Sequence, residues 1–336
     1  MYYPKISSTC KIPKYKQILQ AIIDDVEKGV LKKDQRLPSI NDLSAELWIG
    51  RDTVERAYRE LKGQGIITSI QGKGNFIAGT GAKRLKILLV FNKLSSYKKI
   101  IYYSFLKTLG DKATLDLHIH HYDVQVFKDI IEKNLGKYNY YVIMPHFSYD
   151  ADQNEYKRIL RSIPGEELVL LDKDLPSLNS KYLAVYQDFE KDIFNALQSA
   201  LDLLNKYQKL TLIFPVDGQY PIEILNGFRY FCLCYNKNFS ILNNLAEEVP
   251  HTGTVYITIE ESDLGDLFKK LKQLNFTPGK EVGIISFNDT ALKEVLSVTI
   301  ITTDFEAMGQ TAANLLLNRK QIKVKNSFYM IRRTSL

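Results

Sequence analysis

Apolar residues recur at helical spacing in three short segments near the N-terminus, and each segment predicts an amphipathic helix. The first covers residues 14–29 and is stopped by Gly29. The second opens at a capping box formed by Ser39 and Asp42. The third follows Gly50, and a single apolar stripe runs along it: Val54, Ala57, Tyr58 and Leu61.

Two short strands, residues 66–70 and 75–77, are predicted after the third helix, joined by a glycine-rich turn with Lys73 near its tip. On the third helix, the side chains opposite the apolar stripe or in the first turn are polar: Arg51, Asp52, Thr53, Glu55, Arg56 and Arg59. Two short helices with a tight connection are typical of a helix-turn-helix, whose last helix enters the major groove of DNA. The hairpin that follows would be a wing.

From residue 86 onward the pattern changes to apolar strands that alternate with helical segments. The predicted strands are 86–91, 115–121, 139–145, 167–172, 182–187, 209–214, 254–259 and 281–287. The predicted helices are 98–110, 125–135, 152–163, 189–206, 221–235, 261–275 and 304–318. This alternation predicts an α/β fold with a doubly wound parallel sheet, and about 250 residues suit two such lobes better than one.

The expected domains are therefore a winged helix-turn-helix over residues 1–78, a short linker over 79–85, and a two-lobed domain over 86–336. The net charge differs between the N-terminal module and the rest of the chain. Residues 1–84 hold 15 Lys and Arg against 9 Asp and Glu, whereas the rest of the chain holds 30 against 29. Excess positive charge on the small module favours a polyanionic partner, although a solvated basic face without a partner would give the same count.

Composition excludes several other classes. The 336 residues are 45% hydrophobic and 25% charged, as in folded soluble proteins, and no apolar run is long enough to span a bilayer. We expect a cytoplasmic protein, without a secretory signal. The three cysteines lack zinc-type spacing and are expected to be reduced thiols: Cys10, Cys232 and Cys234.

In doubly wound sheets, ligands bind beyond the carboxyl ends of the strands, so polar and aromatic residues there are the first candidates. We expect ligand contacts from Phe91, Asn92, His146, Asp188, Asp217, Tyr220, Glu261, Asn288 and Asp289. Carboxylates, amides and aromatic rings suit a sugar, which has hydroxyl groups and apolar C–H faces. The sequence lacks the enzyme motifs GxSxG, HExxH, the phosphate-binding loop and the dinucleotide fingerprint, so we expect neither catalysis nor a cofactor.

Three of these carboxylates also have simpler explanations. Asp188 and Asp289 could each cap the helix that follows, and Glu261 could stabilise a helix dipole. The segment HIHH at residues 118–121 suggests a metal, but no carboxylate or cysteine at ligand spacing supports one, and no metal site is expected.

The N-terminal segments PKYKQI, LPSINDLSAEL, GRDTVERAYRELKGQGII and GKGNFI resemble the winged-helix head of the GntR regulators. The resemblance implies DNA contacts from Arg36, Arg51, Thr53 and the wing turn. The full set of DNA-binding candidates is Arg36, Ser39, Arg51, Asp52, Thr53, Arg56, Arg59, Gly72, Lys73 and Gly74. Arg51 suits a guanine edge, whereas Arg36, Arg59 and Lys73 suit phosphates. Alternatively, Glu55 and Arg59 pair with each other on the helix surface.

The second domain resembles the sugar-sensing core of LacI-type repressors and periplasmic sugar-binding proteins, through TPGKEVGIISFNDT and ITTDFEAMGQTAANLLL. The resemblance places Asp188 and Glu261 at ligand-facing aspartates of that family. Ile224 stands where an arginine is expected, so Arg229 or the Asp217 loop would replace it.

Together the two resemblances imply a transcriptional regulator with the architecture of the arabinose repressors. We expect a homodimer that binds palindromic half-sites of operator DNA and represses genes for carbohydrate use. A small sugar, a pentose or deoxyhexose such as arabinose or fucose, would control it. The alternatives are a cytoplasmic solute-binding module and a sugar-modifying enzyme, both without DNA function.

Overall fold

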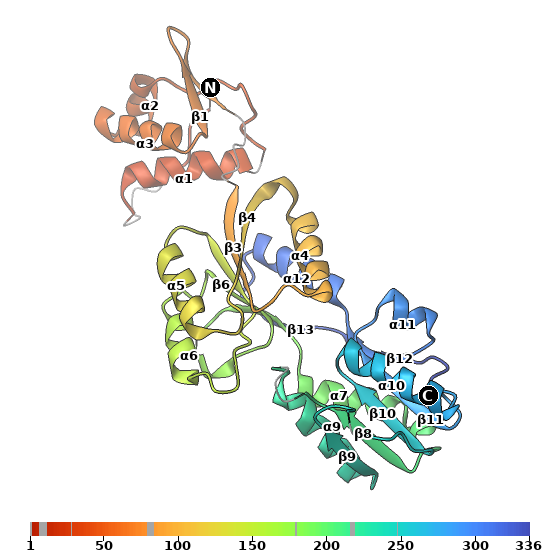
Figure 1. Ribbon diagram of the computed structural model, residues 1–336. Coiled ribbons are helices and arrows are strands. Elements are labelled where there is room, and N and C mark those ends of the chain that lie inside the picture. The colour runs from red at the N-terminus through yellow and green to blue at the C-terminus, as the bar shows by residue number, and fades with distance from the viewer. Residues whose placement is uncertain are drawn as a thin grey trace. The chain divides into compact units, whose positions relative to one another are not determined.

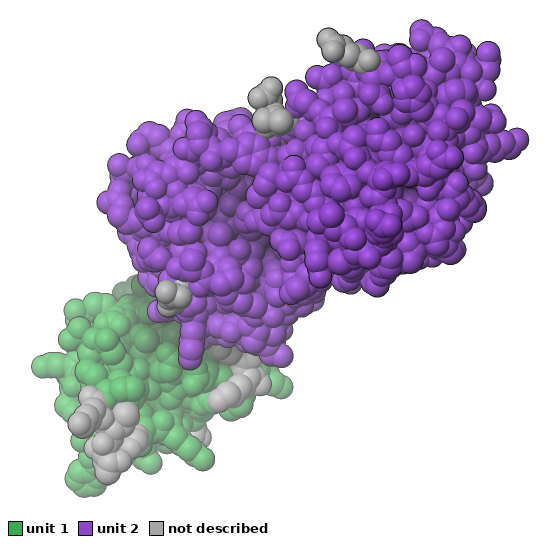
Figure 2. Space-filling view, turned by 90° about the horizontal axis from the view of Figure 1, so that it is seen from below, with its two compact units in different colours: residues 1–85, 111–114 green, residues 86–110, 115–336 purple. Residues whose placement is uncertain are grey.

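The computed structural model describes residues 2–6, 12–27, 29–78, 84–178, 180–215, 219–246 and 248–336 (Figure 1). The chain forms two compact units, residues 1–85 with 111–114 and residues 86–110 with 115–336 (Figure 2). Most of the expected linker, residues 79–83, lies outside the described residues, as do Cys10 and Asp217. The domain boundaries stay a prediction.

Unit 1 is a winged helix-turn-helix, as predicted. It comprises α1 (Lys14–Glu27), α2 (Ile40–Leu47), α3 (Arg51–Gly63), β1 (Ile67–Ile70) and β2 (Gly74–Ile77). The capping box at α2 is confirmed, because the Ser39 hydroxyl accepts from the Asp42 N–H at 3.1 Å and the Asp42 carboxylate accepts from the Ser39 N–H at 3.3 Å. The predicted stripe on α3 is fully buried and packs on α1 residues Ile18, Ile22 and Val26.

Unit 2 contains two six-stranded sheets, in agreement with the predicted two-lobed α/β fold (Figure 1). The sheet of lobe 1 has the order β13-β7-β6-β5-β3-β4. Its strands are β3 (Leu85–Phe91), β4 (Ala113–Ile119), β5 (Tyr140–Ile143), β6 (Leu168–Asp172), β7 (Leu183–Tyr186) and β13 (Lys323–Lys325). Its helices are α4 (Ser96–Leu109), α5 (Val124–Asn134), α6 (Gln153–Arg161) and α12 (Phe305–Leu317), with short 3-10 turns η1 (Gly110–Lys112) and η2 (Pro176–Leu178).

The sheet of lobe 2 has the order β14-β12-β11-β10-β8-β9, and only the edge pair β12 and β14 is antiparallel. Its strands are β8 (Lys209–Ile213), β9 (Asn238–Leu242), β10 (Thr254–Thr258), β11 (Val282–Phe287), β12 (Thr299–Thr303) and β14 (Phe328–Ile331). Its helices are α7 (Phe189–Ser199), α8 (Leu201–Leu204), α9 (Ile222–Cys234), α10 (Glu261–Leu274) and α11 (Ala291–Val295).

The sequence prediction missed four strands and merged two helices. Strands β9, β13 and β14 lie at sheet edges and are partly exposed. Strands β9 and β13 lack a continuous apolar run, whereas the apolar run of β14, FYMI, is only four residues long. Strand β12 is buried but has the sequence TIITT, in which threonine conceals a strand-forming segment. The helix expected over 189–206 divides at Ala200, whose φ of −109° and ψ of 18° leave the helical region.

The chain passes between the two lobes three times within unit 2: after β7, after β12 and after β13. The buried side chain of Asn326 links these crossovers. Its amide nitrogen donates to Thr303 Oγ1 and to the Asp304 carbonyl oxygen, both at 2.8 Å. The Asn326 backbone N–H also donates to the Tyr186 carbonyl oxygen at 2.7 Å. We call residues 186–188, 303–304 and 326–327 the crossover region.

Candidate functional site

The first turn of α3 presents polar side chains to solvent. Arg51 and Asp52 are exposed, and Thr53 is partly buried. The turn before α3 uses Gly50 as its N-cap, which adds no side chain. Among the described residues, Arg51 has no ion-pair partner. Its guanidinium is therefore available to an external acceptor.

Arg36 lies against the wing. It forms an isolated antiparallel bridge with Phe76, and an added Cβ on Gly74 would approach Arg36 Nε to 3.4 Å. Gly74 has a φ of 107° and Gly72 a φ of 74°, and both values favour glycine. Ile70 pairs with Gly74 in the hairpin, which places Lys73 in the exposed turn. The wing glycines therefore form a turn that places two cations, Arg36 and Lys73, at the wing.

The other arginines of α3 have partners within unit 1. The Arg56 guanidinium lies 3.9 Å from the centre of the Tyr15 ring and pairs with Glu60 at 3.4 Å. Arg59 pairs with Glu55 at 3.5 Å, which is the alternative that the sequence left open. Such exposed pairs are worth under about 1 kcal/mol, so a phosphate can still compete for either arginine.

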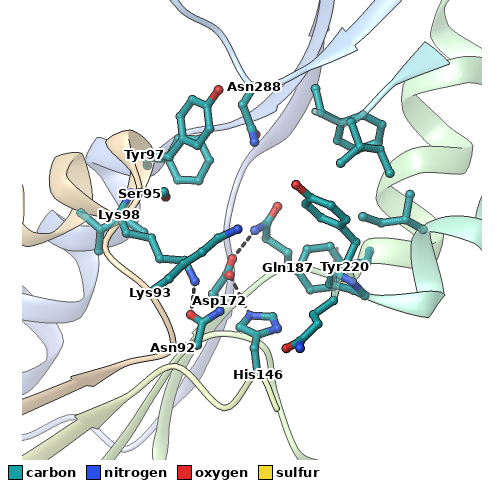
Figure 3. A pocket seen from close by; sticks show the side chains of 18 of the residues that line it. Asn92, Lys93, Ser95, Tyr97, Lys98, His146, Asp172, Gln187, Tyr220 and Asn288 are labelled. Carbon is teal, nitrogen blue, oxygen red and sulfur yellow. Dashed lines mark hydrogen bonds and ion pairs between the residues drawn. The ribbon is translucent and has the colours of Figure 1, made fainter. Parts of the chain in front are cut away.

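Unit 2 contains a pocket of about 160 Å³ beside the ends of several parallel strands (Figure 3). The polar and tyrosine side chains that line it are Asn92, Lys93, Ser95, Tyr97, Lys98, Tyr122, His146, Asp172, Gln187, Gln219, Tyr220 and Asn288. The apolar lining residues are Ile101, Phe189, Pro221, Ile224, Ile259, Phe287, Phe305 and Phe328. Because both lobes contribute side chains, a bound ligand would contact both.

Asp172 is the centre of a buried hydrogen-bond network in the pocket. His146 Nε2 donates to Asp172 Oδ2 at 2.8 Å, and the Gln187 amide nitrogen donates to Asp172 Oδ1 (Figure 3). Burial is the largest single effect and would raise the pKa of Asp172, but the hydrogen bonds from His146 and Gln187 and the charge of Lys98 together lower it. Burial lowers the pKa of His146. The pair is therefore an ionised carboxylate held by a neutral imidazole at neutral pH.

Two lysines face the same network. Lys98 Nζ donates to Asn92 Oδ1, and burial lowers the pKa of Lys98 to about 8. Lys93 Nζ lies 5.9 Å from the centre of the Tyr122 ring and 5.5 Å from that of Tyr220. Figure 3 shows both lysine side chains directed into the pocket.

The structure brings four of the nine expected ligand residues to this pocket: Asn92, His146, Tyr220 and Asn288. Four others are described but do not line it. Phe91 is fully buried in the core, and Glu261 is largely exposed at the start of α10. Asp188 pairs with Lys191 at 3.1 Å, and Asp289 pairs with Arg333 at 2.8 Å. Asp217 lies outside the described residues.

Asp188 occupies the N-cap position of α7, but its side chain makes no cap hydrogen bond there. The capping alternative is wrong for Asp289, because Thr290 caps α11. Glu261 is the first residue of α10, where its charge complements the helix dipole.

Sequence reasoning missed both lysines, Tyr122 and Gln187 as pocket residues. Lys93 and Lys98 follow Asn92 closely after β3, so extending the search by about two helical turns past each strand would have found them.

Among the described residues, no three His, Cys, Asp or Glu side chains are placed to hold a metal ion. Within the same part of the chain, the helices are too short or too polar to cross a membrane.

Comparisons with known proteins agree with both halves of this architecture. The family model of the bacterial regulatory proteins of the gntR family matches residues 14–77. The HTH-type transcriptional repressor YtrA of Bacillus subtilis is 32% identical over 95 residues, which are 28% of this chain and 70% of YtrA. The HTH-type transcriptional regulator TreR of the same bacterium is 29% identical over 240 residues, which are 70% of this chain and 89% of TreR.

The fold of unit 2 has a counterpart in a LacI family transcriptional regulator from Enterococcus faecium, solved with bound ribose. It has a TM-score of 0.58 at 15% identity, and the alignment covers 74% of this chain and 98% of that protein. YtrA is 32% identical to this chain over 70% of its own length, so the chain belongs to the GntR family of bacterial regulators, and its second unit has the two-lobed fold of the Enterococcus faecium regulator.

Proposed function

We propose that the chain is a one-component transcriptional repressor whose winged helix binds operator DNA and whose pocket binds a small sugar that weakens DNA binding. The observation that carries the DNA proposal is the exposed first turn of α3, where Arg51 has no partner among the described residues. Arg51 would donate to a guanine edge, while Arg36 and Lys73 would bind phosphates on the flanking backbone. Repression is proposed because YtrA is a repressor.

The test of DNA binding is a titration of affinity against salt, using duplexes selected from genomic DNA. Contacts to about 6–10 phosphates predict a loss of roughly 10³–10⁵-fold between 50 and 200 mM salt. Arg51→Ala should cost about 1–3 kcal/mol and relax specificity at one base pair. Arg59→Ala, which removes a paired arginine of the same helix, should weaken all sequences equally. Salt-independent binding would contradict the proposal and favour a solute-binding module.

The pocket suits one monosaccharide. A cavity of about 150 Å³ holds a single six-membered ring, and this pocket has about 160 Å³. Tyr97 stacks on Phe305 with ring centres 5.4 Å apart, which gives a flat apolar surface for the C–H face of a sugar. We therefore propose a sugar of pentose or deoxyhexose size as the effector. The relative solved with ribose shares the fold and supports this size.

A thermal-shift screen of monosaccharides tests whether the effector is a sugar. A true effector at a hundredfold excess over its Kd should stabilise the protein by about 2.7 kcal/mol, and it should also lower the affinity for the selected duplex. If no monosaccharide, neutral or acidic, shifts the Tm while DNA binding is intact, the sugar proposal is wrong.

A homodimer is proposed because one winged helix offers few contacts for specific binding. An apolar row on α4 is exposed, formed by Ile100, Tyr103 and Leu106, and Tyr103 is 62% exposed. The opposite face of α4 packs on α12 inside lobe 1, so this row is free in one chain. Tyr103→Glu should convert a dimer to a monomer in sedimentation analysis, and an unchanged mass would exclude this surface.

A further inference from the structure

Resting on the proposed sugar pocket, we infer that its ligand carries an acidic group, a carboxylate or a phosphate, that binds between Lys93 and Lys98. A neutral pentose or deoxyhexose does not need two cations in its pocket. The effector would then be an acidic sugar of the proposed size.

Neither ammonium group forms an ion pair among the described residues, although the charge of Asp172 partly opposes the lowering of the Lys98 pKa by burial. Within the described ranges, Lys98 Nζ has one hydrogen-bond partner, the neutral amide oxygen of Asn92. In the same ranges, Lys93 Nζ lies near the rings of Tyr122 and Tyr220 alone, at 5.9 and 5.5 Å from the ring centres. Two buried or half-buried cations that share one carboxylate charge are costly, and a bound anion would reduce that cost.

The carboxylate of the pocket is already engaged. Of the described lining residues, Asp172 alone carries a carboxylate, and both of its oxygens accept hydrogen bonds, from His146 and from Gln187. Two lysine charges therefore face one carboxylate charge. The first turn of α4, which carries Lys98, adds the positive end of a helix dipole to the same side.

The pocket also offers groups for the sugar part of such a ligand. The side-chain oxygen of Gln219 is buried and has no hydrogen-bond partner in the part of the chain that the structure describes, so it can accept from a hydroxyl group. The Tyr97 and Phe305 rings provide the apolar surface. An acidic sugar would thus satisfy the lysines and this oxygen together.

Lysines also donate hydrogen bonds to neutral hydroxyl groups, and the variants must separate charge from donor capacity. Lys93→Gln and Lys98→Gln remove the charge and keep an N–H donor. Lys99→Gln is the matched control, because Lys99 is exposed on the same helix and does not line the pocket.

The experiment compares the Tm of the full chain in sodium acetate, sodium phosphate and sodium chloride at equal ionic strength and neutral pH. Acetate represents a carboxylate and phosphate represents a phosphoryl group, so the more stabilising anion identifies the acidic group of the ligand. We expect one anion to raise the Tm of the wild type and of Lys99→Gln above its value in chloride. The rise should be lost in the Lys93→Gln/Lys98→Gln double variant.

Two results would overturn the inference: no anion-specific rise in the wild type, or a rise of equal size in the double variant. If Lys98→Gln fails to fold, as judged by its Tm in chloride, Lys93→Gln alone provides the test, since the Lys93 amine makes no hydrogen bond among the described residues. DNA affinity without added ligand is measured separately. Its absence in the wild type would count against the proposed function, whereas stabilisation by a neutral sugar equally in wild type and double variant would overturn only this inference.

Discussion

Replacing Asn326 by alanine tests whether the crossover region stabilises unit 2. The Asn326 side chain is 6% exposed and donates two hydrogen bonds, to Thr303 Oγ1 and to the Asp304 carbonyl oxygen. Neither group is left without a hydrogen bond in the variant. The Thr303 hydroxyl still donates to the Ser327 carbonyl oxygen, and the Asp304 carbonyl oxygen still accepts from the Met308 N–H. The cost is therefore two net hydrogen bonds at about 0.5–1.5 kcal/mol each, or about 2 kcal/mol.

The assay is urea unfolding followed by circular dichroism, with the free energy of unfolding taken from the transition of unit 2. Asn318→Ala is the control, since Asn318 makes one exposed hydrogen bond, to the Asn314 carbonyl oxygen, at the end of α12. We expect the control to change stability by less than about 0.5 kcal/mol. If Asn326→Ala also falls within about 0.5 kcal/mol of wild type, the crossover region does not depend on this side chain and the reasoning fails.

Two further predictions concern the wing and the pocket. Gly74→Ala forces a non-glycine residue to a φ of 107° against Arg36, at a cost of about 1–2 kcal/mol, and operator affinity measured by fluorescence anisotropy should fall roughly 5- to 30-fold. Unchanged affinity would exclude a role of the wing in DNA binding. His146 and Asp172 both have lowered pKa values in the folded chain, and burial lowers the pKa of His120 to about 4. Below pH 6.5 the unfolded chain therefore binds more protons than the folded chain, and the free energy of unfolding falls as the pH drops. The variant His146→Gln should show a flatter dependence of Tm between pH 7 and 5, and an equal slope would refute this assignment.

The winged helix was predictable because its signals are local. Each signal affects only residues close to it in the sequence: the capping box of Ser39, the helix stop at Gly29 and the apolar stripe of α3. Each of these fixes a helix boundary or a buried face without reference to the rest of the chain. The Arg56 guanidinium, in contrast, contacts Tyr15, which lies 41 residues earlier in the sequence, and no local pattern indicates this contact.

The pocket was only half predictable for the same reason. Strand ends identify Asn92 and His146, since parallel strands bring their carboxyl ends to one edge. They do not reveal that Asp289 is neutralised by Arg333, which follows it by 44 residues. Phe91 is the last residue of β3, and its side chain is buried like those of the four residues before it, because this parallel strand is covered on both faces.

The position of the pocket relative to the crossovers explains how a ligand could act on lobe geometry. Gln187, Phe305 and Phe328 line the pocket, and each lies directly beside one of the three crossovers. A ligand that touches all three contacts the segments through which any change in lobe angle must pass. It can shift that angle only by as much as it binds one arrangement better than another. Because this coupling is reciprocal, a sugar that weakens operator binding must itself bind more weakly to the repressor on DNA.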